Sequence, residues 1–480
     1  MSVLVVDVGT SGVRAAVVQS DGRVTDAHYR EVLPTTPAQG FVEFDAGEMA
    51  GAVLAVAHAA LMTGGPVDAV GIANQRASTV LWDRATGKPV APGIGWQDLR
   101  TVGTCLMLQA EGIRLAPNQS ATKLSMLLDL ADPDRVRDLC FGTVDSWVAW
   151  VLSDGRLHVT DHTNAGVTGL VSSDCSGWDL EVCEALRIPA AVLPTLVSST
   201  GVVGEAGALQ GAPVIAGIAG DQQASLVGQG CLAPGTAKAT FGTGGMLDCS
   251  VGLDRPAFAR RGEAGTFPIV AWSRNSELNW GLEAVMLSAG SCIEWLRDDL
   301  GIITTAAETD SMAASVPDSG GVYFVPALLG LGTPVWDFGA RGTLLGLTRG
   351  TTRNEIVRAV LEGIAHRGAD LLEAVVADSG LGVESLKVDG GMSANITFLQ
   401  ALADATGRLI EVAPVTEATT LGAAFLAGTA TGVWPSLGAA SSLRPARLVV
   451  EPRRRLDRAR WLEARSRAEQ TVPELSALDF

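Results

Sequence analysis

Apolar runs separated by short polar turns open the chain and predict antiparallel strands. Residues 3–6 form an apolar strand, the stretch DVGTSG at residues 7–12 turns the chain, and residues 13–18 return as a second strand. Asp21 and Gly22 predict another hairpin turn. The chain is therefore expected to begin with a β-hairpin whose turn combines glycines with hydroxyl side chains.

Helical and extended patterns alternate over the rest of the first half. Residues 46–61 are rich in alanine and have helical spacing, and residues 67–73 form a buried strand that ends at Asn74. Residues 214–218 form a further apolar strand, and the pattern of residues 222–229 then indicates the start of a helix. Alternation of this kind predicts an α/β architecture.

A strand, a Gly/Thr turn and a second strand recur in the second half. The turn FGTGG at residues 241–245 lies between the apolar residues 236–240 and 246–249. Two such hairpins, each near the start of one half, indicate a duplicated domain. We place the two domains at residues 1–229 and 230–480.

The C-terminal part adds a third turn and a terminal helix. Residues 386–388 form a short strand before the sequence DGG, and residues 393–405 have helical spacing. The charged and apolar residues of 456–469 predict an amphipathic helix. The basic run at residues 453–460 is expected to be a solvated helical face, the alternative being an anion site.

Composition and charge narrow the classes of function. A chain of 480 residues is too long for one compact core, and 47% hydrophobic with 18% charged residues is typical of a soluble globular protein. The net charge of −17 argues against nucleic acid as the main partner, because phosphate-binding surfaces need clustered cations. The apolar run at the N-terminus is short and reaches Asp7 at once, so neither a signal peptide nor a membrane span is expected.

Cysteine usage points to a reducing compartment. The 7 cysteines are scattered without a C-x-x-C pair, which gives zinc no support and is typical of reduced thiols. We therefore expect a soluble cytoplasmic protein with no membrane partner.

The turn at residues 7–12 is a candidate phosphate site. Its glycines and small hydroxyl residues expose consecutive backbone N–H groups, which suit phosphate oxygens, and Arg14 adds a cation. Asp7 lies at the strand end, where a carboxylate can hold Mg²⁺ through water. The alternative is an ordinary hairpin turn. The sequence lacks G-x-x-x-x-G-K-[ST], which excludes a Walker-type phosphate loop.

Two later turns extend this pattern. Residues 241–245 repeat the phosphate-binding features, and the DGG turn at residues 389–391 offers exposed backbone against which a nucleobase or ribose can pack. Phosphate-binding turns from each half would grip a triphosphate from opposite sides of a cleft. Together the three turns favour nucleotide binding.

Asp221 is the candidate catalytic residue. It follows an apolar strand, where open α/β sheets place their ligands, and Gln222 comes directly after it. A carboxylate here can accept the proton of a substrate hydroxyl and align that hydroxyl with a γ-phosphoryl group. The alternative role of this aspartate is a helix N-cap.

Two polar groups beside apolar segments are candidates for binding a polyol. They are NQR at residues 74–76 and WQD at residues 96–98. The face of Trp96 suits the C–H side of a polyol, while Arg76 can hydrogen-bond its hydroxyls. The alternative is a core tryptophan with polar residues at its rim.

Several long stretches of the sequence resemble the FGGY carbohydrate kinases, and among these the glycerol kinases. The resemblance extends over essentially the whole chain. The matching stretches are DVGTSGVRA, GIANQRASTVLWDRATGKPV, FGTVDSWVAW, HVTDHTNA, AGIAGDQQASLVGQ, FGTGG, YFVPALLGLGTPVWDFGARGTLLGLTRGTTR and VDGGMSAN. The resemblance implies two actin-like domains of the ribonuclease-H type that close on ATP and a substrate.

The resemblance also implies roles for individual residues. Asp221 is expected to be the catalytic base and, with Asp7, a carboxylate associated with Mg²⁺. Phosphate contacts are expected from Thr10, Ser11, Arg14, Thr243 and Gly244. The residues expected around the adenosine are Gly290, Ile293, Glu294, Gly391 and Asn395. The residues expected in the substrate pocket are Arg76, Ala77, Trp96, Asn118, Asp221, Gln222 and Met246.

The sequence departs from the glycerol kinase pattern at several of these positions. Ala77 takes the place of a glutamate that accepts hydrogen bonds from glycerol, Asn118 that of a tyrosine, and Met246 that of a phenylalanine. Glu294 replaces a glutamine that faces the adenine. The pocket is therefore expected to be roomier and to lack one strong acceptor, which changes discrimination among substrates. The segment 204–212 is expected to be shorter than the loop that binds a regulatory sugar bisphosphate.

These observations predict in-line transfer of the ATP γ-phosphoryl group to a primary hydroxyl of glycerol or a closely related small polyol, with ATP and Mg²⁺ as cofactors. Three alternatives stay open. They are a kinase of the same family for a longer polyol or a ketose, an actin-like ATPase, and a catalytically silent sugar sensor. A homodimer is expected from the resemblance alone.

Overall fold

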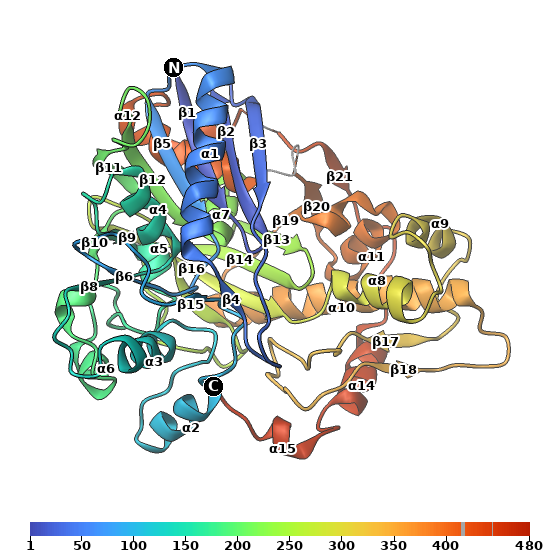
Figure 1. The fold of residues 1–480 in the computed structure, drawn as a ribbon. Coiled ribbons are helices and arrows are strands. Elements are labelled where there is room, and N and C mark those ends of the chain that lie inside the picture. The colour runs from blue at the N-terminus through green and yellow to red at the C-terminus, as the bar shows by residue number, and fades with distance from the viewer. Residues whose placement is uncertain (414–417, 444) are drawn as a thin grey trace.

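The computed structural model describes residues 1–413, 418–443 and 445–480, and its two halves repeat one arrangement of strands (Figure 1). In the first half, β1 pairs antiparallel with β2 and parallel with β5, which also pairs parallel with β12. In spatial order the strands are β3 (Val24–Glu31), β2 (Gly12–Gln19), β1 (Ser2–Val8), β5 (Ala69–Asn74), β12 (Val214–Gly220) and β11 (Thr200–Glu205). The pairing of β1 with β2 confirms the N-terminal hairpin, although Asp7 belongs to β1 and not to the turn.

The second half follows the same plan. β13 pairs antiparallel with β14 and parallel with β19, as β1 does with β2 and β5. The strands in spatial order are β15 (Phe267–Arg274), β16 (Glu277–Met286), β14 (Gly245–Gly252), β13 (Ala237–Phe241), β19 (Ser385–Asp389), β20 (Leu409–Val412) and β21 (Leu448–Val450). A pair between Thr200 and Arg274 joins β11 to β15, so the two halves form one 13-stranded sheet. The repeated order confirms the α/β fold, while the boundary at residue 229 stays a prediction.

Alternate residues of β1 face two different helices. Leu4 and Val6 belong to the core under α1 (Ala46–Gly64), whereas Val3 belongs to the core under α12 (Ala418–Thr431). Successive strand residues point to opposite faces of a sheet, so helices cover both faces and every position of β1 is buried or half-buried. Within the described residues α1 alone is long and apolar enough to cross a membrane, and here its apolar side packs in this core.

A close crossing of α7 (Asp221–Gly228) with α12 also connects the halves. A Cβ at Gly422 would lie 1.7 Å from the carbonyl oxygen of Ala224, and one at Gly228 would lie 2.0 Å from that of Ala418. Only glycine allows two helix backbones to approach this closely. The crossing therefore anchors the helix that begins with Asp221.

Shorter elements complete both halves. The remaining strands are β4 (Glu43–Phe44), β6 (Val80–Asp83), β7 (Gly93–Ile94), β8 (Leu139–Gly142), β9 (Val159–Asp161), β10 (Thr195–Val197), β17 (Tyr323–Val325) and β18 (Thr343–Leu345). The remaining α-helices are α2 (Val102–Ala110), α3 (Ala121–Ala131), α4 (Val144–Leu152), α5 (His162–Ala165), α6 (Leu180–Ala185), α8 (Gly290–Glu294), α9 (Glu308–Ala314), α10 (Arg353–Ser379), α11 (Ile396–Thr406), α13 (Leu437–Ser441), α14 (Arg458–Ala468) and α15 (Pro473–Ser476). Three short helical turns are η1 (Ala190–Val192), η2 (Trp295–Asp299) and η3 (Gly391–Ala394).

Most of the basic run near the C-terminus is exposed, as its pattern predicted, but only Arg458 and Arg460 lie on a helix, and Arg458 is half-buried. Arg460 is exposed as expected, with 71% of its side-chain surface accessible. Arg458, in contrast, lies 2.6 Å from Asp370, and Arg454 lies 3.1 Å from Glu362. Both acidic partners are on α10, far from the run in sequence, so its own pattern could not reveal them.

Candidate active site

The carboxyl ends of three parallel strands bring the candidate residues to one edge of the first sheet. In the register of β1, β5 and β12, Asp7 pairs with Ala73 and Ala73 pairs with Ala219. Arg76 follows β5 and Asp221 follows β12, so both lie at the same edge as Asp7. With about 4.8 Å between neighbouring strands, the backbones of residues 7 and 221 are roughly 10 Å apart.

The first Gly/Thr turn, at residues 9–11, contacts a residue of the expected substrate pocket. Trp96 Nε1 donates a hydrogen bond to Thr10 Oγ1 over 3.4 Å. Gln75 Nε2 donates to the carbonyl oxygen of Gly9 over 3.3 Å. The structure therefore joins a residue expected at the phosphates, Thr10, to one expected at the polyol, Trp96.

Ser11 and Arg14 flank this contact. Ser11 is exposed at the turn, and its carbonyl oxygen accepts a hydrogen bond from the Tyr29 hydroxyl over 3.0 Å. Arg14 lies on β2 directly opposite Asp7 on β1, and both are half-buried. The residues expected at phosphate and at metal thus form one cross-strand pair of the hairpin.

The second Gly/Thr turn, at residues 242–244, accepts backbone hydrogen bonds from the start of α8. The N–H groups of Ala289 and Ser291 donate to the carbonyl oxygen of Thr243 over 2.9 Å and 3.1 Å. The N–H of Gly290 donates to that of Gly242 over 2.8 Å, and a Cβ at Gly290 would lie 2.6 Å from the same oxygen. Glycine is therefore required at 290, where the expected adenosine segment meets the expected phosphate turn.

The third turn lies directly against the second. Gly390 has a φ of 86°, and a Cβ there would lie 2.5 Å from the carbonyl oxygen of Phe241. Gly391 is exposed at the start of η3, and Gly244 is half-buried. Backbone from three separate segments, at residues 242–244, 289–291 and 390–391, is therefore gathered in the second half.

Three residues expected around the adenosine differ in their surroundings. Asn395 is the N-cap of α11: its Oδ1 accepts from the N–H of Phe398 over 2.8 Å, and its Nδ2 donates to Thr309 Oγ1 over 2.9 Å. Ile293 is buried in the core of the second half, whereas Glu294 is exposed at the end of α8. The side chain of Asn395 thus fixes the backbone beside the third turn.

Asp221 is the first residue of α7, one position after the N-cap Gly220. The helix dipole favours a carboxylate here, and Oδ1 accepts from the N–H of Gln222 over 2.8 Å. Burial raises the pKa of Asp221, while the positive charge of Arg76, whose Nε lies 3.6 Å from Oδ1, opposes the rise. The side chain keeps 34% of its surface exposed, so the carboxylate is accessible at the sheet edge.

Arg76 links Asp221 to the second half of the chain. Its Nη2 lies 2.7 Å from Glu283 Oε2 and 3.7 Å from Met246 Sδ. Glu283 lies on β16 and belongs with Lys238 on β13 and Asp248 on β14 to a buried charged group, and all three were missed from the sequence. The sequence does contain a signal for them, since each is a charged residue within an otherwise apolar strand. A charge buried in this way needs a partner, so each could have been predicted to form a buried ion pair.

A fourth missed residue, Lys123, holds the other wall of the expected pocket. Lys123 is fully buried, and its Nζ donates to the carbonyl oxygens of Trp96 over 3.1 Å and Asn118 over 3.5 Å. Burial lowers the pKa of Lys123 to about 7. Ala77 is buried with a φ of 60°, and its carbonyl oxygen accepts from Ser120 Oγ over 2.9 Å. These contacts bring Trp96, Ala77 and the backbone of Asn118 to one wall.

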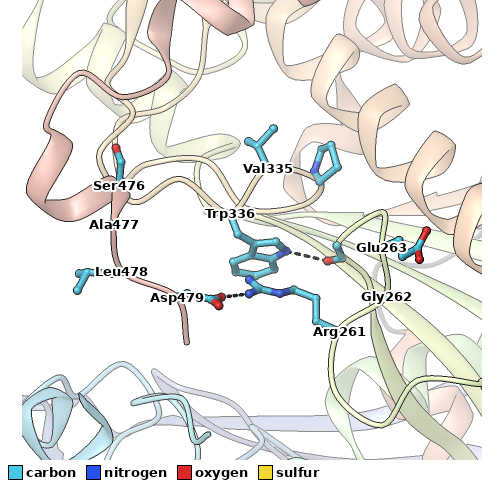
Figure 2. A pocket seen from close by; sticks show the side chains of 11 residues that line it. Arg261, Gly262, Glu263, Val335, Trp336, Ser476, Ala477, Leu478 and Asp479 are labelled. Carbon is cyan, nitrogen blue, oxygen red and sulfur yellow. Dashed lines mark hydrogen bonds and ion pairs between the residues drawn. The ribbon is translucent and has the colours of Figure 1, made fainter. Parts of the chain in front are cut away.

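The described residues contain no group of three or more His, Cys, Asp or Glu side chains arranged to hold a metal ion. The cavity drawn in Figure 2 is also a separate feature, because its lining residues include none of the candidates. There Arg261 pairs with Asp479, and the Trp336 Nε1 donates to the carbonyl oxygen of Gly265 over 2.7 Å.

Comparison with known proteins adds independent evidence. Residues 2–228 match the N-terminal domain, and residues 237–431 the C-terminal domain, of the FGGY family of carbohydrate kinases. The chain is 43% identical over 463 residues to a glycerol kinase of Gloeobacter violaceus, covering 94% of this chain and 92% of that one. It is 43% identical over 483 residues to a glycerol kinase of Trichlorobacter lovleyi, covering 96% of each. The crystal structure of Plasmodium falciparum glycerol kinase with ADP has a TM-score of 0.89 and 26% identity, covering 100% of this chain and 99% of that one.

Proposed function

The chain belongs to the FGGY family of carbohydrate kinases, and we propose that it transfers the γ-phosphoryl group of ATP to a primary hydroxyl of glycerol or a closely related small polyol. One observation carries the proposal: a partly exposed carboxylate, Asp221, lies at the sheet edge, paired with Arg76. Identity of 43% to glycerol kinases over more than nine-tenths of the chain supports glycerol as the substrate.

Asp221 is proposed as the base that accepts the proton of the attacking hydroxyl. Burial raises the pKa of Asp221, which makes its carboxylate a stronger base than that of a free aspartate, while the positive charge of Arg76 opposes the rise. Arg76 Nη1 is buried without a hydrogen-bond partner, so it suits a hydroxyl oxygen of the substrate. Trp96 and Gln222 complete the polyol contacts in this proposal. Because the transition state is loose, positioning and electrostatics supply most of the rate enhancement.

The two Gly/Thr turns are proposed to bind the phosphates, through Thr10 and Ser11 in the first and Thr243 and Gly244 in the second. The donor set fits Mg²⁺, since this ion binds through one or two carboxylates, phosphate oxygens and waters rather than an all-protein cage. Asp7 and Asp221 would hold it through waters. When bound, the ion neutralises charge on the β- and γ-phosphates.

A longer polyol or a ketose is the second candidate substrate. Ala77 favours it, because this buried position carries no acceptor, and the neighbouring wall has the flexible Met246. A screen of ADP release across glycerol, tetritols, pentitols and ketopentoses decides between them. ATP hydrolysis that no polyol changes would instead indicate an ATPase, and the absence of any phosphorylated product would indicate a sensor.

Asp221→Asn tests the mechanism. The variant keeps the size of the side chain but cannot take up a proton, so kcat is expected to fall by about 10²–10⁴-fold. ATP affinity, measured by calorimetry without Mg²⁺, is expected to stay near the wild-type value, because Asp221 is proposed to act on the hydroxyl and to reach the nucleotide only through the metal ion. Near-normal turnover would remove Asp221 from this role.

We also propose a cytoplasmic location and a homodimer. All 7 cysteines are free and buried, which suits a reducing compartment. Non-reducing electrophoresis of protein from fractionated cells tests the first proposal, and sedimentation equilibrium tests the second.

A further inference from the structure

Three charged residues stand side by side on adjacent strands of the second half. Lys238 on β13 pairs in register with Asp248 on β14, and Asp248 pairs in register with Glu283 on β16. Directly opposite residues share a face of the sheet, with Cβ atoms about 4.5–5.5 Å apart. Lys238 and Asp248 are fully buried, and Glu283 is 8% exposed.

Two like charges directly opposite each other destabilise a sheet unless each has a partner. Asp248 Oδ2 lies 2.8 Å from Lys238 Nζ, and Glu283 Oε2 lies 2.7 Å from Arg76 Nη2. Each carboxylate therefore holds one cation. The first cation comes from the next strand, but Arg76 comes from the first half of the chain, at the end of β5.

Each of these cations in turn acts on the expected substrate pocket. Lys238 Nζ donates to Gln222 Oε1 and, over 3.0 Å, to Thr240 Oγ1. Arg76 faces Asp221 at 3.6 Å through its Nε. The two acids, Asp248 and Glu283, are called the acidic pair. Asp248 contacts the pocket indirectly, because it binds Lys238, which binds Gln222. Glu283 binds the pocket residue Arg76 directly.

The acids in direct ion pairs with Arg76 and Lys238 outnumber these two cations by one. The carboxyl groups are those of Asp221, Asp248 and Glu283, against the cations of Arg76 and Lys238. Burial raises the pKa of Glu283 to about 7, with Asp248 adding to the rise and Arg76 opposing it. The positive charge of Arg76 favours the ionised form of Glu283, in which the carboxylate holds the guanidinium.

We propose that Asp248 and Glu283 are positioning residues of the phosphoryl transfer, which from the second half of the chain fix the side chains of Gln222 and Arg76 in the first. The inference rests on the proposed polyol kinase activity. It goes beyond that activity because neither acid is expected to touch substrate or nucleotide.

Steady-state kinetics of Glu283→Gln and Asp248→Asn test the proposal. Both variants keep their shape but lose the charge that orients Arg76 or Lys238. A hydrogen bond to a charged group is worth enough to change kcat/KM for the polyol by about 10–100-fold, with the larger part expected in KM. KM for ATP is expected to change less than about twofold, since neither acid acts on the nucleotide.

Glu362→Gln is the matched control. Glu362 is also 8% exposed and pairs with an arginine, Arg358, over 2.8 Å, but it lies on α10, and neither Arg358 nor its second partner Arg454 is a pocket residue. It is expected to lower the midpoint of thermal unfolding without changing KM for the polyol. Glu283→Asp, which restores the charge on a shorter stem, is expected to recover part of the loss.

The outcomes separate the inference from the function on which it rests. A wild-type protein that phosphorylates no polyol contradicts the proposed function. An active wild type with Glu283→Gln and Asp248→Asn kinetically like Glu362→Gln overturns the positioning role, as does an equal loss toward polyol and ATP. A crystal structure of Glu283→Gln gives a further readout: Arg76 is expected to leave position 283, and an unmoved Arg76 contradicts the proposal.

Discussion

Asp370 is a shared acceptor for three arginines and an indole, and its replacement tests how charge holds the C-terminal helix. Arg367, on the same helix α10, lies 2.7 Å from Asp370 Oδ2. From α14, Arg458 lies 2.6 Å from Oδ1 and Arg465 lies 3.1 Å from Oδ2. Trp461 Nε1 also donates to Oδ1 over 3.1 Å. Figure 1 shows α14 as a separate element beside β17 and β18, so this carboxylate fastens it to α10.

The size of the effect follows from burial. Asp370 and Arg367 have fully buried side chains, and although burial alone would raise the pKa of Asp370, the arginines hold it below its usual value. Removing one partner from a buried ion pair typically costs about 3–5 kcal/mol, because the other charge stays buried and unpaired. For a domain of roughly 150–250 residues, each kcal/mol shifts the unfolding midpoint by about 2–4 °C, so Asp370→Asn is expected to lower it by about 6–20 °C.

Glu373→Gln provides the matched control on the same helix. Glu373 also binds Arg458, over 2.8 Å, but its side chain is 60% exposed. An exposed pair is worth only about 0–1 kcal/mol, so this variant is expected to unfold within a few degrees of the wild type. Differential scanning calorimetry compares the three proteins. Equal midpoints for Asp370→Asn and Glu373→Gln would refute the view that the buried carboxylate holds α14.

Three further predictions concern packing, surface charge and pH. Gly422→Ala is expected to cost about 1–3 kcal/mol by overpacking, whereas Gly51→Ala, where a Cβ meets nothing within 4 Å, is expected to stabilise by about 0.4–1 kcal/mol; urea unfolding compares them. Asp479→Asn removes pairs with Arg114 and Arg261, and the side chain of Asp479 is 44% exposed, so calorimetry is expected to show a loss of at most about 1 kcal/mol for each pair. Burial raises the pKa of Asp145 from 3.8 to about 7, so the unfolded state loses its proton first as pH rises. Wild-type stability relative to Asp145→Asn is then expected to fall by about 4 kcal/mol between those pH values, and unchanged relative stability would contradict this.

Patterns that act over a few residues were readable from the sequence. The hairpin at residues 7–12 and the FGTGG turn were located correctly because period-two alternation and glycine-rich turns are local signals. One-residue details were less certain: Asp7 proved to lie within β1, and Asp221 begins α7 instead of capping it. The last strand residue and the first turn residue are neighbours in sequence, and so are the N-cap and the first helical residue. The local pattern does not distinguish between two such neighbours.

Contacts between segments far apart in the sequence could not be predicted from such local patterns. Glu283 pairs with Arg76, which lies 207 positions away in the sequence, and the residues next to either one do not indicate its partner. The aspartate in MLDCSV and the glutamate in GLEAVM did carry a signal, since each interrupts an apolar strand that packs in a core. Pairing them requires the strand order, and that order emerges only when the sheet is assembled.

The contacts that hold the expected polyol-binding residues also join the two halves of the chain. Arg76 and Gln222 come from the first half of the chain, whereas Glu283 and Lys238, which hold them, come from the second. Any separation of the halves at this edge would therefore leave the buried Glu283 carboxylate without its cation and Gln222 without Lys238, at a cost of several kcal/mol for the broken ion pair. A polyol bound to Arg76 and Gln222 can shift the equilibrium toward the state with joined halves. It can do so only by as much as it binds that state more tightly than the state with separated halves. The acidic pair makes that difference large, because the polyol contacts and the contacts between the halves depend on the same two side chains.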